Sequence, residues 1–387
     1  MNIQIDGAAT MNKGGELMLY SVLEQIEKRY PNANVYWNAK LGAKSDKYID
    51  TSLNFHKRWL MEKFGGVFLR LRLVSIFRKL KLPYRWMNHM YGFRDKKMDV
   101  IFDASGYAYC DGRHSSWIND LEHYLRKCKR DDVKIFFLPQ AFGPFNSSSG
   151  QKIAMILNNY SDMLIAREPV SEKHLLKANI PPEKILIYPD FTCLCEGVFP
   201  SKYENVKGKV CIIPNVRMIK DANVLEADYL LYIKNIINLC FETGKDVFLL
   251  NHENDRDQIL CEKINGLFDN KLSIVCDLKA KEIKGVIKES YAVISARYHG
   301  IANALNSGVP CLANSWSYKY ELLFKEFGQE NMILDIKSTF SETKDAINML
   351  LHEESNQFIR KQLKEQSMKI KDEIESMWEK IWEYVEK

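Results

Sequence analysis

The sequence predicts an α/β protein built from two Rossmann-like domains with parallel sheets, followed by a C-terminal helix. Short apolar runs of strand length alternate with longer amphipathic segments along the chain, and this order of successive β–α units favours parallel sheets. Between Pro189-Asp190 and Lys209 the composition shifts to Cys, Gly, Pro and Lys without periodicity, which indicates a connection between domains. The tail 353–387 carries one continuous helical stripe.

The first domain is predicted to span residues 1–198. It opens with a strand at 2–5, a flexible loop at 7–15 and a helix at 16–30, whose apolar residues recur every three or four positions. A strand at 35–37 completes this βαβ opening, so the first loop is expected to face a ligand. Further strands are expected at 99–102, 133–138, 163–166 and 185–188, and helices at 115–128, 151–160 and from 167 onward.

A helical insertion is predicted at about 55–92 of this domain. Within it, residues 68–85 interleave Arg and Lys with Phe, Leu, Ile and Val. Such a basic amphipathic helix can lie on an anionic membrane surface. The favoured interpretation is a helical hairpin packed on the domain with solvated arginines, because helices that pack on a core are the commoner kind.

The second domain is predicted to span residues 209–352. Strands are expected at 210–214, 246–250, 273–276, 292–294 and 311–313, with helices at 229–243, 258–267 and 280–290. The tail 353–387 would either pack back across the first domain or mediate formation of a homo-oligomer. Its apolar stripe consists of Ile370, Ile374, Met377, Ile381 and Val385.

Bulk composition is that of an ordinary globular protein. The 387 residues are 46% hydrophobic and 27% charged, and the net charge of +5 is too mild to indicate nucleic acid as a partner. The nine cysteines are scattered, and Cys193-x-Cys195 is too close for paired zinc ligands, so reduced thiols and no metal site are expected. No stretch reaches the roughly 20 apolar residues that span a bilayer, and the N-terminus lacks a signal layout. We expect a cytoplasmic protein, peripheral at the inner face of the membrane if residues 68–85 lie on it.

Charge is concentrated in the loop after the predicted strand 292–294. In open parallel sheets such loops form the ligand crevice, and a helix that starts there favours anions. Arg297 offers a rigid fork of donors for a carboxylate or phosphate, and His299 can exchange a proton near neutral pH. Arg217 follows the predicted strand 210–214 in the same way. The sequence therefore predicts an anionic ligand.

The same residues carry a family resemblance. The segment S-A-R-Y-H-G-I-A-N-A-L-N-S-G-V-P at 295–310, followed by Tyr318-Lys319, resembles the signature of polysaccharide pyruvyl transferases. In place of the family's run of glycines before Asp111, this chain keeps only Gly106. The supporting blocks, in the family's order, are Asn12-Lys13-Gly14-Gly15-Glu16, Gly106 to Asp111, Leu138 to Pro144, Ile165-Ala166-Arg167-Glu168 with Ser171, Pro189-Asp190 and Asn251-His252.

The resemblance implies a GT-B-like fold, in which the two domains face a cleft. It implies phosphoenolpyruvate as co-substrate and a sugar in a polysaccharide, or in its lipid-linked precursor, as acceptor; a cyclic pyruvate ketal across two hydroxyls is then the product. A lipid-linked acceptor would suit a membrane contact through residues 68–85. No cofactor or metal is expected, because arginines can neutralise the phosphate.

The resemblance also implies roles for individual residues. His299 is the expected acid and Asp111 the expected base, with Glu16 in reserve. The expected donor-binding residues are Arg217, Arg297, Gly300, Lys319, Asn251 and His252. The expected acceptor-binding residues are Asn12, Gly106, Gln140, Arg167 and Asp190.

Plainer alternatives stay open for these residues and for the function. An Arg after a strand is often a paired surface charge, and a His or Glu at a helix start can simply stabilise that end. A nucleotide-sugar glycosyltransferase of the GT-B fold would also place arginines beside a phosphate. A non-catalytic sugar-binding scaffold is the other alternative, and the missing glycines before Asp111 favour it.

Overall fold

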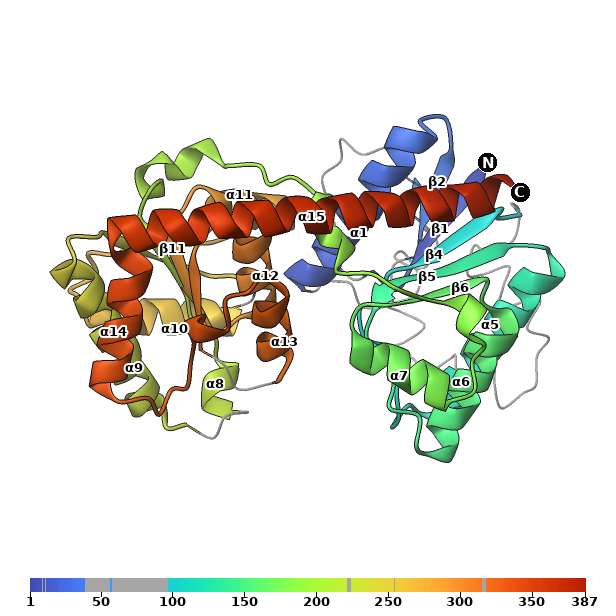
Figure 1. Cartoon of the computed structure of the whole chain (residues 1–387), viewed down its shortest axis with the longest axis horizontal. Helices are drawn as coiled ribbons and strands as arrows, with labels where there is room; N and C mark the ends of the chain where they lie inside the picture. Colours follow the sequence, from blue (N-terminus) through green and yellow to red (C-terminus); the bar gives the residue numbers. More distant parts are fainter. Residues whose placement is uncertain are drawn as a thin grey trace, which may run out of the picture. The chain divides into compact units, whose positions relative to one another are not determined.

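The computed structural model describes residues 1–8, 10, 12–38, 56–57, 97–220, 224–253, 255–314 and 318–387. These residues form two compact units (Figure 1), Met1–Thr192 together with Glu373–Lys387, and Cys193–Asp372. The predicted insertion at 55–92, with its basic stretch 68–85, lies outside the described residues except for the short strand at 56–57.

The first unit is built on a parallel sheet of seven strands in the order β3-β2-β1-β4-β5-β6-β7. The chain starts in the middle of this sheet, runs to one edge and returns to place β4 beside β1. The strands are β1 (Asn2–Asp6), β2 (Asn34–Trp37), β3 (His56–Lys57), β4 (Val100–Asp103), β5 (Lys134–Gln140), β6 (Met163–Ala166) and β7 (Ile185–Ile187). The helices are α1 (Lys13–Arg29), α5 (Ser115–Arg130), α6 (Ser148–Tyr160) and α7 (Pro169–Lys177).

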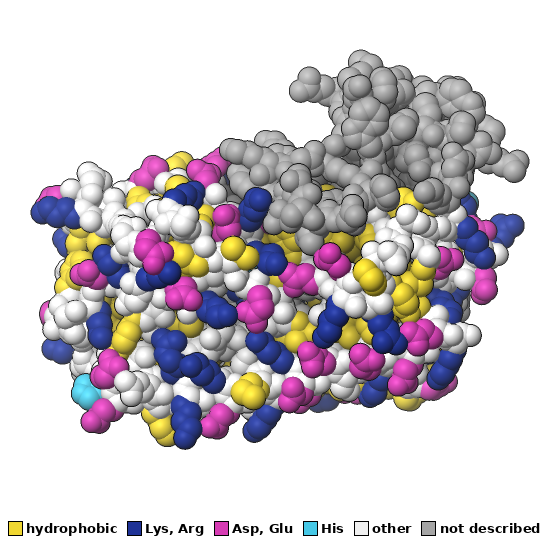
Figure 2. Space-filling view, turned by 90° about the horizontal axis from the view of Figure 1, so that it is seen from above, with side chains coloured by type: hydrophobic (Ala, Val, Ile, Leu, Met, Phe, Trp, Pro, Cys, Tyr) yellow, Lys and Arg dark blue, Asp and Glu magenta, His cyan; other side chains and the backbone are white. Residues whose placement is uncertain are grey.

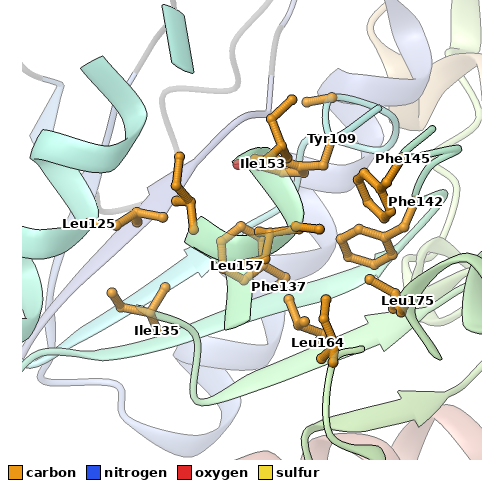
Figure 3. Packing of buried hydrophobic residues seen from close by; sticks show 14 of the residues in the cluster. Tyr109, Leu125, Ile135, Phe137, Phe142, Phe145, Ile153, Leu157, Leu164 and Leu175 are labelled. Carbon is orange, nitrogen blue, oxygen red and sulfur yellow. The ribbon is translucent and has the colours of Figure 1, made fainter. Parts of the chain in front are cut away.

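Side chains of this sheet alternate between its two faces, because residues along a strand have a period of two. Ile135 and Phe137 of β5 join a buried cluster with Leu157 of α6 (Figure 3). Phe136 points to the opposite face, where its ring lies 5.6 Å from that of Phe102 on β4. Apolar side chains on both faces explain why these strands read as continuous hydrophobic runs.

The second unit repeats this architecture with a parallel sheet of six strands in the order β10-β9-β8-β11-β12-β13. The strands are β8 (Val210–Ile213), β9 (Val247–Leu250), β10 (Ser273–Val275), β11 (Ala292–Ser295), β12 (Cys311–Asn314) and β13 (Ile333–Leu334). The helices are α8 (Arg217–Lys220), α9 (Glu226–Glu242), α10 (Asp255–Gly266), α11 (Ala280–Lys288), α12 (Tyr298–Asn306), α13 (Tyr318–Glu326) and α14 (Phe340–Leu351).

The tail forms one long helix, α15 (Glu353–Glu386), and the division between the units falls within it. In the second unit, Ser367 Oγ donates to the Asn306 carbonyl at 2.7 Å. In the first unit, Trp378 and Trp382 stack with centroids 5.2 Å apart, and both meet the Phe102 ring edge-on. Contacts within one chain therefore cover the apolar stripe. Its members Ile370, Ile374, Met377 and Ile381 are buried, and Val385 is half-buried.

The surface mixes both signs of charge. Figure 2 shows Lys and Arg interspersed with Asp and Glu over the described part of one face, with apolar side chains scattered between them. On that face no single-sign patch of the kind that binds nucleic acid is drawn. Within the described residues, no helix is long and apolar enough to cross a membrane. The nine cysteines are thiols, and all but Cys276 are buried.

Candidate functional site

The order of the second sheet reverses between β8 and β11, and ligands of open α/β sheets bind beyond the strand ends at such a switch point. The loop after β8 carries Asn215 and Arg217, and the loop after β11 carries Arg297 and His299. Asn215 Nδ2 donates to the Ala296 carbonyl at 2.8 Å and so joins the two loops. The topology therefore brings the predicted anion-binding loops to one edge of this sheet.

Arg297 is held inside this edge instead of being presented to solvent. Its backbone N–H donates to Ser295 Oγ at 2.9 Å, and its side chain is only 10% exposed. Nη1 forms an ion pair with Glu253, and Nη2 forms one with Asp257. Nε is buried and has no hydrogen-bond partner among the described residues. Two carboxylates of the same unit therefore compensate the charge of this guanidinium.

The two carboxylates differ in how firmly they are held. Asp257 lies fully buried on α10, and its Oδ1 also accepts from the Val216 backbone N–H at 3.2 Å. Burial raises the pKa of the Asp257 carboxyl, and the Arg297 charge opposes that rise. The side chain of Glu253, just after β9, is 24% exposed. Asp257 thus anchors Arg297, whereas Glu253 is the partner that an incoming anion could replace.

The other predicted cations of this unit differ from Arg297 in how far they are exposed to solvent. Arg217 is exposed in the first turn of α8. His299 is half-buried in the first turn of α12, and its ring meets that of Tyr298 edge-on at 5.5 Å. Lys319 belongs to α13, but its side chain lies outside the described part of the structure. The positive end of α12 is therefore next to His299, where it favours a negative ligand group.

Gly300, Asn251 and His252 shape the site by packing. A Cβ on Gly300 would come within 2.9 Å of the Ile213 side chain, so the glycine lets α12 approach β8. Asn251 Oδ1 accepts from the Glu253 backbone N–H at 3.3 Å and so shapes the turn that carries Glu253. His252 is 4% exposed. These contacts give Gly300 and Asn251 a structural role at the strand ends, and His252 is buried next to Asn251.

The sequence prediction missed Glu253 and Asp257, the two partners of Arg297. They stand about forty positions before Arg297, on the far side of β10 and α11. One signal was available: acidic residues follow the strand β9, whose end lies at the same edge of the sheet as those of β8 and β11. Their pairing depends on the strand order β9-β8-β11, which the sequence pattern does not specify.

The switch point of the first sheet lies between β1 and β4, and a carboxylate ends each of these strands. Asp6 and Asp103 are register partners and are both buried. Asp6 accepts from the Tyr124 hydroxyl at 2.6 Å, and Asp103 accepts from the Tyr109 hydroxyl at 2.8 Å and Gln140 Nε2 at 3.1 Å. Burial, reinforced by the charge of Asp6, raises the pKa of the Asp103 carboxyl. The predicted residue Gln140 therefore joins a buried acidic pair that the sequence prediction missed.

Asp111, the predicted base, holds a loop. Its Oδ2 accepts from the Asn146 backbone N–H at 2.9 Å and its Oδ1 from that of Ser147 at 3.0 Å. Burial raises the pKa of Asp111, but the hydrogen bonds from Ser147 and Asn146 outweigh it and lower the pKa overall. A carboxylate with occupied acceptor sites and a lowered pKa takes up a proton poorly. The geometry gives Asp111 a positioning role before α6, and its role as base stays a prediction.

The predicted residues at the start of α1 stabilise that helix. Asn12 is its N-cap and accepts from the Gly15 backbone N–H at 2.6 Å. Glu16 is fully buried and forms an ion pair with Lys13 at 2.8 Å. The Lys13 charge favours the ionised form of Glu16, so the ion pair opposes uptake of a proton by this carboxylate. Both residues lie beside the loop that follows β1.

The other predicted acceptor-side residues are linked through the loops after β4, β5 and β6. Gly106, at φ 71°, accepts at its carbonyl from the Ala141 N–H at 3.0 Å. The Gln140 carbonyl accepts from the Arg167 N–H at 3.1 Å. The Arg167 side chain forms an ion pair with Asp190 at 3.4 Å. The structure thus brings these four predicted residues to one edge of the first sheet.

In the described parts of both units, no group of three or more His, Cys, Asp or Glu side chains could hold a metal ion.

A comparison with protein families decides the family of this chain. Residues 12–318 match the family described as polysaccharide pyruvyl transferase. The chain belongs to the polysaccharide pyruvyl transferase family. Membership makes it a transferase that acts in polysaccharide biosynthesis. The family match covers the loops that carry Arg217, Arg297 and His299 and the acidic pair's Asp103, whereas Asp6 precedes it.

One curated relative supports the family of this pyruvyl transferase, and solved structures show its fold. The amylovoran biosynthesis protein AmsJ of Erwinia amylovora is 23% identical over 342 residues, which cover 81% of this chain and 80% of AmsJ. A UDP-GlcNAc 2-epimerase of Neisseria meningitidis, solved with UDP-GlcNAc, has a TM-score of 0.56 at 11% identity and covers 99% of this chain and 100% of its own. Anabaena HepE, solved with UDP, has a TM-score of 0.55 at 10% identity and covers 100% of this chain and 99% of its own. These likenesses confirm the predicted GT-B-like α/β class with two Rossmann-like parallel sheets.

Proposed function

We propose that this transferase moves the enolpyruvyl-derived group of phosphoenolpyruvate onto two hydroxyls of one sugar in a polysaccharide or its lipid-linked precursor. The product is a cyclic pyruvate ketal, and inorganic phosphate is released. The observation that supports this most is the Arg297–His299 loop, which combines the family signature with a place at the switch point of the second sheet.

The donor is proposed to bind where the loops after β8 and β11 meet. Phosphoenolpyruvate carries a carboxylate and a phosphate, so its site needs several cations. Arg217, Lys319 and Arg297 supply them, with the N-terminus of α12 as a further positive group. Glu253 has to leave Arg297 when the donor binds, because Asp257 stays in place and three anions would otherwise share one guanidinium.

The proposed reaction needs one acid and one proton acceptor. His299 donates a proton to the CH₂ carbon of the enol, and the first sugar hydroxyl forms a C–O bond to the adjacent carbon. The second hydroxyl then attacks the same carbon while the C–O bond to phosphate breaks. Of the two hydroxyl protons released, one replaces the proton that His299 gave and the other leaves with phosphate or solvent. Arginines neutralise the leaving phosphate, so no metal is required by this chemistry.

Donor selectivity tests this function directly. Isothermal titration calorimetry of the full chain with phosphoenolpyruvate should show saturable binding, and UDP should show none. Mixing the chain with phosphoenolpyruvate and candidate acceptor polysaccharides should release phosphate, which a non-catalytic scaffold would not do. Binding of UDP without binding of phosphoenolpyruvate would instead support a nucleotide-sugar glycosyltransferase, since two solved structures of this fold hold UDP-GlcNAc or UDP.

Replacing Glu253 with glutamine is expected to tighten the binding of phosphoenolpyruvate. Glutamine keeps a hydrogen bond to Arg297 but removes the negative charge that competes with the donor. We expect the Kd to fall roughly fivefold, which corresponds to about 1 kcal/mol. Calorimetric titration measures this Kd. Glu289→Gln removes the same charge at an exposed position and serves as the control. An unchanged or weaker affinity would show that Glu253 stays on Arg297 in the complex.

A further inference from the structure

A cavity of about 180 Å³ lies in the first unit, whereas the proposed donor residues belong to the second. It opens beside the carboxyl ends of β1 and β4, between this edge of the sheet and α5. Its apolar wall includes Leu121 and Leu125 of α5 and Phe137 of β5; Figure 3 shows the last two within the buried cluster. Leu121, Tyr124 and Trp117 are partly exposed, so the cavity reaches the surface of the unit. Engineered cavities of ~150 Å³ hold a benzene ring, so this one has room for a single six-membered ring.

The polar wall of the cavity is the acidic pair Asp6 and Asp103. Asp6 accepts from Gln4 Nε2 and the Tyr124 hydroxyl, both at 2.6 Å. Asp103 accepts from the Tyr109 hydroxyl, from Gln140 Nε2 and from the backbone N–H and hydroxyl of Ser105. These donors hold the carboxylates rigidly in place. Gln140 Oε1 is buried beside the pair and has no hydrogen-bond partner among the described residues.

An aromatic wall completes the cavity. The rings of Tyr109 and Trp117 lie 5.9 Å apart, and both line it. The Arg113 guanidinium lies over the Trp117 ring at 5.7 Å, and Arg113 Nε donates to the Ala108 carbonyl at 2.8 Å. The loop that follows β4 is thereby fixed against α5. Aromatic faces with adjacent hydrogen-bond acceptors suit a ring that has apolar C–H groups and polar hydroxyls.

The chemistry of these walls selects among classes of ligand. Two carboxylates repel an anion, and a purely apolar ligand would bury them further without offering a hydrogen-bond donor. A metal ion would need several further oxygen ligands, and no third carboxylate is among the described residues that line the cavity. A neutral ring with several hydroxyls can donate to Asp6, which accepts only two hydrogen bonds from the described residues, and can pack against the aromatic wall.

We infer that this cavity is the subsite for one sugar ring of the acceptor, with Asp6 accepting hydrogen bonds from its hydroxyls and Trp117 and Tyr109 packing on its face. A sugar of the polysaccharide is the expected occupant because of the proposed function, on which this identity rests. The subsite places sugar recognition in the first unit, independently of the residues that bind the donor.

Filling the cavity tests the subsite. Leu121→Trp places a large ring at its apolar wall, and His123→Trp makes the same change at an exposed position of α5 as the matched control. Asp6→Asn is a second variant, which removes charge with little change of shape. The probes are the methyl glycosides of glucose, galactose and mannose, followed by saturation-transfer NMR on the full chain, with phosphoenolpyruvate titrated calorimetrically in parallel.

We expect at least one glycoside to bind the natural chain and His123→Trp alike. It should bind roughly tenfold more weakly to Leu121→Trp and to Asp6→Asn, because hydrogen bonds to a charged group are blocked or lost. The affinity for phosphoenolpyruvate should stay unchanged in all four. If no glycoside binds, or if Leu121→Trp binds it as the natural chain does, the subsite is wrong. If glycosides behave as expected but phosphoenolpyruvate does not bind to any form, the subsite stands and the proposed donor is wrong.

Discussion

Replacing His299 with alanine is expected to lower kcat for phosphate release by roughly 10²–10⁴-fold, the range that a general acid contributes. His299 lies in the first turn of α12 beside Arg297, and it is the residue proposed to protonate the enol carbon. The half-buried ring is not part of the core, so the variant should fold normally. The measurement is phosphate release at saturating phosphoenolpyruvate, with thermal unfolding recorded on the same samples.

A structural role for His299 predicts a different pattern. If the ring only packs against Tyr298, then Tyr298→Phe should retain activity and His299→Ala should lower stability and activity together. If His299 is the acid, Tyr298→Phe still retains activity, but His299→Ala loses kcat with its unfolding temperature and its affinity for phosphoenolpyruvate unchanged. Full turnover by His299→Ala would remove it from the proton transfer even if the reaction class stands.

Replacing Trp378 with alanine is expected to destabilise the first unit by about 3–5 kcal/mol, the usual cost of deleting a buried aromatic side chain. Trp378 is 2% exposed, stacks on Trp382 and meets the rings of Phe102 and Phe191. The Trp378 Nε1 group has no hydrogen-bond partner among the described residues. Deleting the side chain therefore also removes the unfavourable free energy of one buried polar group without a hydrogen bond. The loss should therefore fall at the lower end of the range.

Hydrogen exchange of the β4 and β5 amides measures this effect within the first unit. Glu383→Ala, an exposed change on the same helix, is the control and should leave the exchange unaltered. If Trp378→Ala exchanges like the control, the end of α15 does not stabilise the sheet. If α15 serves mainly to join two copies of the chain, Trp378→Ala should instead change the molar mass of the assembly in solution.

The order of strands and helices was predictable because it depends on local patterns. The run Val133–Leu138 was expected as a strand and is found as β5 at Lys134–Gln140, and Ala292-Val293-Ile294 is found within β11. Apart from Lys134, both runs are apolar because their sheets are buried on both faces, and such a run can be recognised from neighbouring residues alone. The tail helix was predictable for the same reason, since its stripe repeats every turn.

The sequence by itself determined the α/β class, the family and the loops that carry Arg217, Arg297 and His299, because each of these follows from residues that are close together in the chain. Only the tertiary structure decided what those side chains contact. The pairing of Arg297 with Glu253 and Asp257, and the meeting of Asp6 with Asp103, depend on which strands become neighbours in the two sheets. Charges far apart in sequence interact only when the fold brings them within a few ångströms, and burial then decides how strongly they do so.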